Sequence, residues 1–171
     1  MMSMLEAGGI PVLTDNLRKP DEDNLKGYFE YEQVKQIEED QSWLPLAEGK
    51  VVKLISALLK HLTPDYHYKI IFMRRKIDEI LASQKRMLER RGEPTDMVPD
   101  DLMAQLFENH IQEVQAWMES QPNIDYIEID YNKALENPEE EIKRVNGFLG
   151  GVLNESEMMK IIEPRLYRQR K

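Results

Sequence analysis

The hydrophobic positions of this chain fall into two patterns: short apolar runs that predict strands, and spaced apolar stripes that predict helices. Residues 68–73 (YKIIFM) form a continuous apolar run, which is typical of a strand covered on both faces in a parallel sheet. Residues 125–130 (DYIEID) alternate between polar and apolar and predict a second strand. Two shorter runs at 10–13 and 50–55 predict further strands, because they are apolar or β-branched.

Helical spacing of apolar residues occurs between and after these strands. Gly8-Gly9 is a stop signal for a helix at the start of the chain, and Asn137-Pro138 followed by three glutamates is a strong helix start. The helices that these patterns predict cover residues 1–7, 28–39, a short segment ending at 62, 77–90, 100–120 and 137–150. Strands that alternate with helices predict an α/β fold with a parallel sheet flanked by helices.

Length and composition narrow the class of protein. A chain of 171 residues with 41% hydrophobic residues suits one domain, spanning 1–171. The net charge of −9 argues against a nucleic-acid partner, which would need a basic face. The chain has no cysteine, no apolar run of membrane-spanning length and no signal-peptide pattern, so we expect a cytoplasmic protein with no membrane partner.

The first candidate ligand-binding residues follow the 68–73 run, because ligands of parallel sheets bind beyond the carboxyl ends of the strands. Arg74 and Arg75 come directly after this run, and Ser83 follows Arg75 by eight residues. A guanidinium offers a fork of donors that suits a phosphate, and a serine two helical turns later can reach the same anion. The alternative from spacing alone is a solvated arginine pair and a surface serine.

Three stretches resemble sulfotransferases that use 3'-phosphoadenosine 5'-phosphosulfate (PAPS), above all small bacterial members of that family. Residues 69–88 (KIIFMRRKIDEILASQKRML) resemble the segment that binds the 3'-phosphate. Residues 50–61 (KVVKLISALLKH) resemble the preceding strand and turn, and residues 127–150 resemble the family's late segment, from an acid-tyrosine strand end to a terminal FLG. The three stretches occur in the family's order and together span most of the chain.

The resemblance implies a P-loop-type fold and transfer of a sulfuryl group from PAPS to a hydroxyl or amine of an acceptor, a small molecule or a glycan. It implies that Arg75 and Ser83 hold the 3'-phosphate, with Arg74 in place of Arg75 if the register is shifted by one residue. Lys53 falls where relatives carry a lysine that stabilises the bridging oxygen as the sulfuryl group leaves. The alternative for Lys53 is an exposed lysine at a strand end, and no metal is implied.

The chain departs from the family at the position of the general base. Relatives carry a histidine two residues after that lysine, whereas this chain has Ile55, whose hydrocarbon side chain cannot take a proton. Some relatives use a glutamate instead, which makes Glu30 and Glu32 candidates, although a solvated acidic helix start explains both. The histidines of this chain are expected to be surface or boundary residues without a recognisable partner: His61, His67 and His110.

A second departure lies at the amino end. Family members begin with a central strand and a loop of the type P-R-S-G-T-S, whose backbone amides bind the 5'-phosphosulfate. This chain starts with MMSMLEAGGI, which resembles the helix after that loop. We therefore expect an N-terminally incomplete domain, in which Met1 is an internal methionine of a longer protein. A shortened, inactive relative is the competing interpretation.

Two further functions stay open. One is a nucleotide kinase or other P-loop phosphoryl transferase, which would need a Walker lysine and magnesium-binding acids. The other is a non-catalytic interaction domain that docks through the acidic 100–120 helix. Variable loops build acceptor pockets, and the candidate pocket segments here are residues 16–31 and 91–103.

Overall fold

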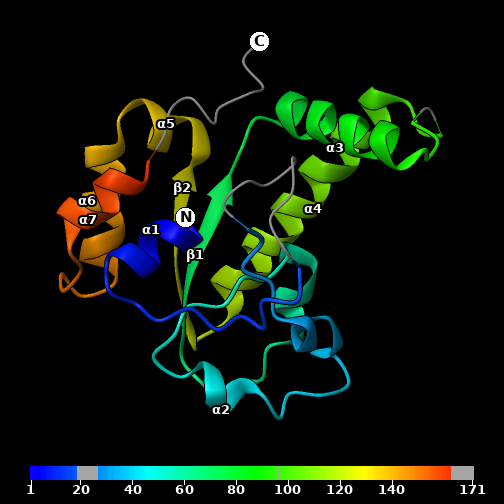
Figure 1. The fold of residues 1–171 in the computed structure, drawn as a ribbon. Helices are drawn as coiled ribbons and strands as arrows, with labels where there is room; N and C mark the ends of the chain where they lie inside the picture. The colour runs from blue at the N-terminus through cyan, green and yellow to red at the C-terminus, as the bar shows by residue number, and fades with distance from the viewer. Residues whose placement is uncertain (19–26, 96, 163–171) are drawn as a thin grey trace.

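A pair of parallel strands lies at the centre of the computed structural model, which describes residues 1–18, 27–95 and 97–162. The strands are β1 (Tyr68–Arg74) and β2 (Ile124–Asp130), and their register places Tyr68 beside Ile124 and Arg74 beside Asp130. Figure 1 shows the two strands with helices on both sides. The predicted α/β class with a parallel sheet flanked by helices is confirmed.

Each face of the strand pair is covered by a different set of helices. One face packs on α1 (Met2–Ala7), α6 (Pro138–Phe148) and α7 (Glu155–Ile161), with a core cluster that includes Leu5, Ile129, Val145 and Met158. The other face packs on the 3-10 helix η2 (Ser56–His61) and on α4 (Asp100–Ser120). That second cluster consists of Leu59, Phe72, Val114 and Met118. Neighbouring residues of a strand thus point to opposite layers, as the pleat requires.

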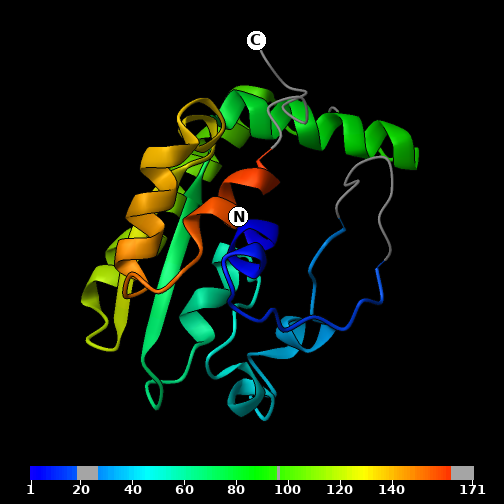
Figure 2. The ribbon, with the colours of Figure 1, turned by 60° about the vertical axis from the view of Figure 1, so that its left-hand side comes forward.

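The remaining elements lie at the ends of this core. The helix α3 (Ile77–Arg91) starts just beyond the carboxyl end of β1 and extends away from the strands, as both views show (Figures 1 and 2). The helix α5 (Tyr131–Glu136) follows β2 directly. Two short helices, the 3-10 helix η1 (Glu32–Gln36) and α2 (Leu44–Ala47), enclose a third cluster around Ile37 and Trp43.

The longer helices begin and end where their sequence signals predict. Asp100 and Asp101 occupy the first turn of α4, and Glu139, Glu140 and Glu141 occupy the first turn of α6, where carboxylates favour the positive end of the helix dipole. The end of α3 is Gly92, with a φ of 68°, a left-handed conformation that glycine adopts without a side-chain clash. Local sequence therefore suffices for these boundaries.

Three local predictions were wrong. The strands expected at 10–13 and 50–55 reduce to one parallel bridge between Val12 and Val51, in which Leu13 N donates to Val51 O and Val51 N donates to Pro11 O. Pro11 has no N–H with which to extend the ladder. The helix expected at 28–39 is confined to η1, since Phe29 has a φ of 51° that no helix accepts. The helices α2, α5 and α7 were not predicted.

The outer edge of β1, on the side away from β2, carries backbone groups that no described residue binds. Tyr68 N donates to Asn123 O, so the parallel register turns the backbone N–H and C=O groups of Lys69, Ile71 and Met73 to that edge. Within residues 1–18, 27–95 and 97–162, no hydrogen bond reaches them. Within the described residues, the outer edge of β1 is therefore an open sheet edge.

Candidate functional site

The carboxyl end of β1 places Arg75 beside a buried carboxylate. Arg75 Nε lies 3.1 Å from Glu79 Oε2, one turn into α3, and its guanidinium carbon lies 5.0 Å from the ring centre of Tyr131. The two terminal nitrogens of Arg75 make no hydrogen bond to any described residue. The side chain is 26% exposed. Arg75 is thus oriented by one nitrogen while the other two remain available to an anion.

Glu79 links the starts of two helices that each follow a strand. Its carboxylate accepts a hydrogen bond from Asn132 Nδ2 at 2.8 Å, and both side chains are buried. Tyr131 and Asn132 begin α5, immediately after β2. A buried carboxylate is stable only when it is paired and hydrogen-bonded, and Glu79 is both. The group fixes the Arg75 guanidinium at the carboxyl ends of the two parallel strands.

Ser83 lies on the same side of α3 as this group. It follows Glu79 by one helical turn, and the Arg75–Glu79 contact shows that the guanidinium lies over that side of the helix. Ser83 is half-buried, and its hydroxyl makes no hydrogen bond to a described residue. The arrangement therefore offers guanidinium N–H groups and a hydroxyl on one helix face.

Arg74 is oriented differently from Arg75. Its Nη1 lies 3.6 Å from Glu128 Oε1 on β2, and the same Glu128 oxygen accepts a hydrogen bond from Gln115 of α4. Arg74 is therefore held on the α4 side of the strand pair, whereas Arg75 is bound to α3. The structure separates the two arginines that the sequence placed next to each other.

Lys53 belongs to a second group, formed by the two segments that meet at the Val12–Val51 bridge. Its ammonium donates to Tyr28 O at 3.0 Å and lies 3.7 Å from Glu30 Oε1. Arg18 pairs with the same Glu30 oxygen at 3.2 Å and stacks on the Tyr28 ring at 3.4 Å. Glu30 is thus shared by two cations, and Lys53 is oriented by the 28–30 segment. No interaction joins this group to Arg75 within the described residues.

A half-buried aspartate holds the segments of the Lys53 group together. The carboxylate of Asp15 accepts hydrogen bonds from Leu17 N at 3.0 Å and Glu32 N at 2.6 Å. These backbone donors, Leu17 first, lower the pKa of Asp15 below its ordinary value, because they stabilise the charged form. Glu32, the other candidate base, is exposed and pairs with Lys35 at 2.8 Å.

Two of the three histidines have partners that the sequence did not reveal. His110 Nε2 lies 2.8 Å from Ser56 Oγ, which joins α4 to η2 across 54 residues, and both residues are half-buried. His61 Nε2 lies 3.7 Å from Glu38 Oε2. The three histidines are half-buried or exposed, as predicted, but the sequence did not reveal the partners of His61 and His110, because partners so distant in sequence leave no local signal.

The sequence matches the protein-family model of the sulfotransferase domain over residues 25–171. The chain belongs to the sulfotransferase domain family. Comparison with curated proteins gives no match, and comparison with solved structures gives none either. No helix in the described parts of this sulfotransferase domain is both long enough and apolar enough to cross a membrane.

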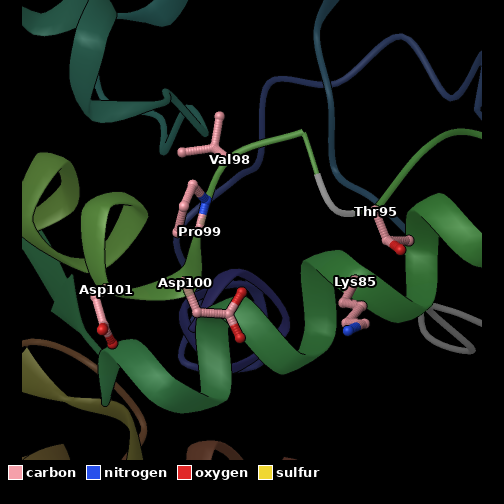
Figure 3. Close-up of a pocket in the computed structure, with 6 residues that line it drawn as sticks. All are labelled: Lys85, Thr95, Val98, Pro99, Asp100 and Asp101. Atoms are coloured by element: carbon pink, nitrogen blue, oxygen red, sulfur yellow. The ribbon is translucent and has the colours of Figure 1, made fainter.

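A hollow of about 340 Å³ lies between α3 and the start of α4 in this sulfotransferase domain. Figure 3 shows the residues around it: Lys85, Thr95, Val98, Pro99, Asp100 and Asp101. Five of these six fall in the 91–103 segment that the sequence suggested as a pocket wall. The other suggested segment, 16–31, lies partly outside the described residues, and its described part holds the Lys53 group.

Sequence reasoning missed three residues around Arg75. Glu79 and Tyr131 contact the Arg75 guanidinium, and Asn132 binds Glu79. One local signal could have found Glu79, because it stands four residues after Arg75 and four before Ser83, which is one helical face. Tyr131 and Asn132 lie within the stretch that resembles the late segment of sulfotransferases. Their proximity to α3 follows from the pairing of β1 with β2.

Proposed function

We propose that this sulfotransferase domain transfers a sulfuryl group from PAPS to a hydroxyl or amine of its acceptor. The observation that carries the proposal is a pair of donor groups at the carboxyl end of β1, the Arg75 terminal nitrogens just before α3 and the Ser83 hydroxyl on α3, which make no hydrogen bond to a described residue. Membership in the sulfotransferase family favours sulfuryl transfer over the nucleotide-kinase alternative.

In this proposal Arg75 and Ser83 bind the 3'-phosphate of the donor. A phosphate needs several N–H and O–H donors in a fixed arrangement, and the Glu79 contact fixes the guanidinium plane before the anion arrives. Arg74 is the weaker candidate, because binding the same phosphate would require it to leave Glu128. PAPS supplies the activated sulfuryl group, and the protein contributes binding, orientation and charge.

Lys53 would stabilise the negative charge that develops on the bridging oxygen as the sulfuryl group departs. Its ammonium has three N–H donors, and Tyr28 O takes one of them. Glu30 lies close enough to hold the Lys53 side chain in one orientation. Because the Glu30 carboxylate also pairs with Arg18, its charge is shared between the two cations and does not fully neutralise Lys53. The 39% exposure of Lys53 leaves its ammonium accessible to a ligand.

The decisive test is isothermal titration with adenosine 3',5'-bisphosphate, whose 3'-phosphate is the group that Arg75 and Ser83 would bind. Adenosine 5'-monophosphate, which lacks it, is the matched ligand. The wild-type chain should bind the bisphosphate more tightly, and an Arg75→Ala/Ser83→Ala double variant should lose about 10- to 100-fold of that preference.

Arg74→Ala is the matched control variant, since it removes the adjacent guanidinium from the α4 side. It should keep the preference for the bisphosphate. An unchanged affinity in the Arg75→Ala/Ser83→Ala variant would overturn the site assignment. Equal affinity of the wild-type chain for the two nucleotides would overturn the proposed donor.

A further inference from the structure

The Lys53 group contains one carboxylate between two cations. Arg18 Nη1 lies 3.2 Å, and Lys53 Nζ lies 3.7 Å, from the same oxygen, Glu30 Oε1. Two positive charges and one negative charge leave these three side chains with a net charge of +1, in a chain whose net charge is −9. A local excess of positive charge in an acidic protein attracts an anion to that place.

Tyr28 holds both cations independently of Glu30. The Arg18 guanidinium stacks on the Tyr28 ring, with 3.4 Å between its carbon and the ring centre, and Lys53 Nζ donates to Tyr28 O at 3.0 Å. Neither contact involves a negative charge, so both remain when the Glu30 carboxylate moves away from the cations. An anion that takes the place of this carboxylate therefore meets two cations that are already oriented.

The two cations have hydrogen-bond donors to spare for such an anion. Arg18 donates from Nη1, and its Nε and Nη2 make no hydrogen bond to a described residue. Lys53 gives one of its three N–H groups to Tyr28 O. The side chains also reach solvent, since Glu30 is 28%, Lys53 39% and Arg18 40% exposed. A guanidinium and an ammonium around one point suit the several oxygens of a sulfate or phosphate group.

The backbone that carries Glu30 has an unfavourable conformation. Phe29, with a φ of 51°, and Asn16, with a φ of 56°, are the non-glycine residues with positive φ in the described parts of the chain. A bulky residue such as phenylalanine rarely adopts this left-handed conformation, and strain of this kind is concentrated at ligand sites. The turn at Phe29 brings Tyr28 O and the Glu30 carboxylate, one on each side of it, to the same Lys53 ammonium.

We infer that Arg18 and Lys53 form a two-cation site for the sulfuryl group of PAPS, and that the Glu30 carboxylate fills this site until the sulfuryl group replaces it. The inference rests on the proposed function, which gives a role to Lys53 but none to Arg18. Glu30 is then an internal competitor that keeps free anions out. PAPS displaces it because a ligand bound through its 3'-phosphate presents the sulfuryl group at a high effective concentration.

A first experiment needs no nucleotide. Sodium sulfate is titrated into the chain at an ionic strength held constant with sodium chloride, and the backbone amide signals of residues 28–30 are followed by NMR. Glu30→Gln should bind sulfate about tenfold more tightly than the wild type, because the neutral side chain no longer competes with the anion or repels it. Arg18→Ala/Glu30→Gln should lose this gain, because one of the two cations is missing.

Glu139→Gln is the matched control for the change in charge. It removes the same negative charge from an exposed ion pair with Lys143 on α6, and it should bind sulfate as the wild type does. Equal gains in Glu30→Gln and Glu139→Gln would overturn the inference, because net charge alone would then explain them. So would an Arg18→Ala/Glu30→Gln variant that binds sulfate as tightly as Glu30→Gln.

A second experiment identifies the anion by isothermal titration with PAPS and with adenosine 3',5'-bisphosphate, which lacks the sulfuryl group. Arg18→Ala should lower the affinity for PAPS about tenfold and leave the affinity for the bisphosphate unchanged. Arg75→Ala/Ser83→Ala should weaken both ligands alike, because both carry the 3'-phosphate. Equal losses for the two ligands in Arg18→Ala, or no loss for PAPS, would overturn the assignment of the sulfuryl group to Arg18.

The two proposals fail in different ways. A wild-type chain that prefers the bisphosphate to adenosine 5'-monophosphate, but whose affinity for PAPS does not change in Arg18→Ala, overturns this inference and leaves the 3'-phosphate assignment intact. A wild-type chain that does not distinguish the bisphosphate from adenosine 5'-monophosphate overturns the proposed function, whatever the sulfate titration shows.

Discussion

Asn132 Nδ2 donates a hydrogen bond to Glu79 Oε1 at 2.8 Å, although 53 residues separate the two side chains in sequence. Glu79 is 4% exposed and Asn132 is 5% exposed. The contact joins the first turns of α3 and α5, which are the two helices that leave the carboxyl ends of β1 and β2. It thereby fixes the guanidinium of Arg75 where the proposed function needs it.

Glu79→Gln should lower the free energy of unfolding by about 2 kcal/mol, because it leaves Arg75 without its counter-charge and weakens a charge-assisted hydrogen bond in a buried position. Urea denaturation followed by circular dichroism measures the change. Glu139→Gln is the matched control: Glu139 pairs with Lys143 on the exposed surface of α6, and its loss should cost less than about 0.5 kcal/mol. Equal effects of the two variants would contradict the structural role of Glu79.

Gly8→Ala should destabilise the domain by about 1–3 kcal/mol, because an added methyl group overpacks the contact between α1 and α7. A Cβ at residue 8 would lie 2.9 Å from Cγ and Sδ of Met158, whose side chain is fully buried. Gly147→Ala in α6 should have the opposite effect on stability, because nothing lies within 4 Å of the added Cβ. It should stabilise the domain by about 0.5–1 kcal/mol through lower unfolded-state entropy. Thermal unfolding of the two variants should shift in opposite directions.

Asp15→Asn should remove a pH-dependent contribution to stability. The pKa of Asp15 is lowered in the folded state by the backbone N–H groups of Leu17 and Glu32, so its stabilising effect is present above the unfolded pKa. It is lost as the pH falls through the lower, folded pKa. Urea midpoints of wild type and variant should therefore differ at pH 6 and converge as the pH drops below about 4. A difference that stays constant down to pH 2 would contradict this role.

Tyr68→Phe should change the alkaline titration of the native protein. Burial, followed by the nearby Tyr66 and Asp65, raises the pKa of Tyr68 to about 12, and its hydroxyl donates to Thr63 O at 2.9 Å. The raised pKa stabilises the fold below the unfolded pKa of about 10, and this contribution is lost as the pH rises toward the folded value. Absorbance of tyrosinate should show one late-titrating group in the wild type that the variant lacks. An unchanged late phase in Tyr68→Phe would assign it to another tyrosine.

The sequence predicted those elements whose signals are local. The run at 68–73 and the alternation at 125–130 became β1 and β2, and the acidic starts of α4 and α6 fell at the predicted residues. Each of these elements is specified by hydrophobic periodicity or by side chains within one helical turn, and both can be recognised directly in the sequence. The sequence did not determine the structure of the short segments at 10–13 and 50–55. A strand needs a partner along its whole length, and these two segments share only one bridge.

The candidate site was predictable as a set of residues but not as an arrangement. The spacing of Arg75 and Ser83, together with the family resemblance, named a phosphate-binding pair, and the 25–171 match confirms the family to which it belongs. The sequence treated Arg74 as a substitute for Arg75, whereas the fold assigns each arginine to its own carboxylate, Glu128 and Glu79. The binding roles of these residues stay predictions.

By itself, the sequence determined the α/β class, the ends of the long helices and the family of this protein, because those depend on patterns between near neighbours in the chain. Only the tertiary structure decided that Asn132 binds Glu79 and that His110 meets Ser56. Such contacts form when parallel strands and packed helices bring distant segments together, and the direction of a side chain depends on that packing rather than on its neighbours in sequence.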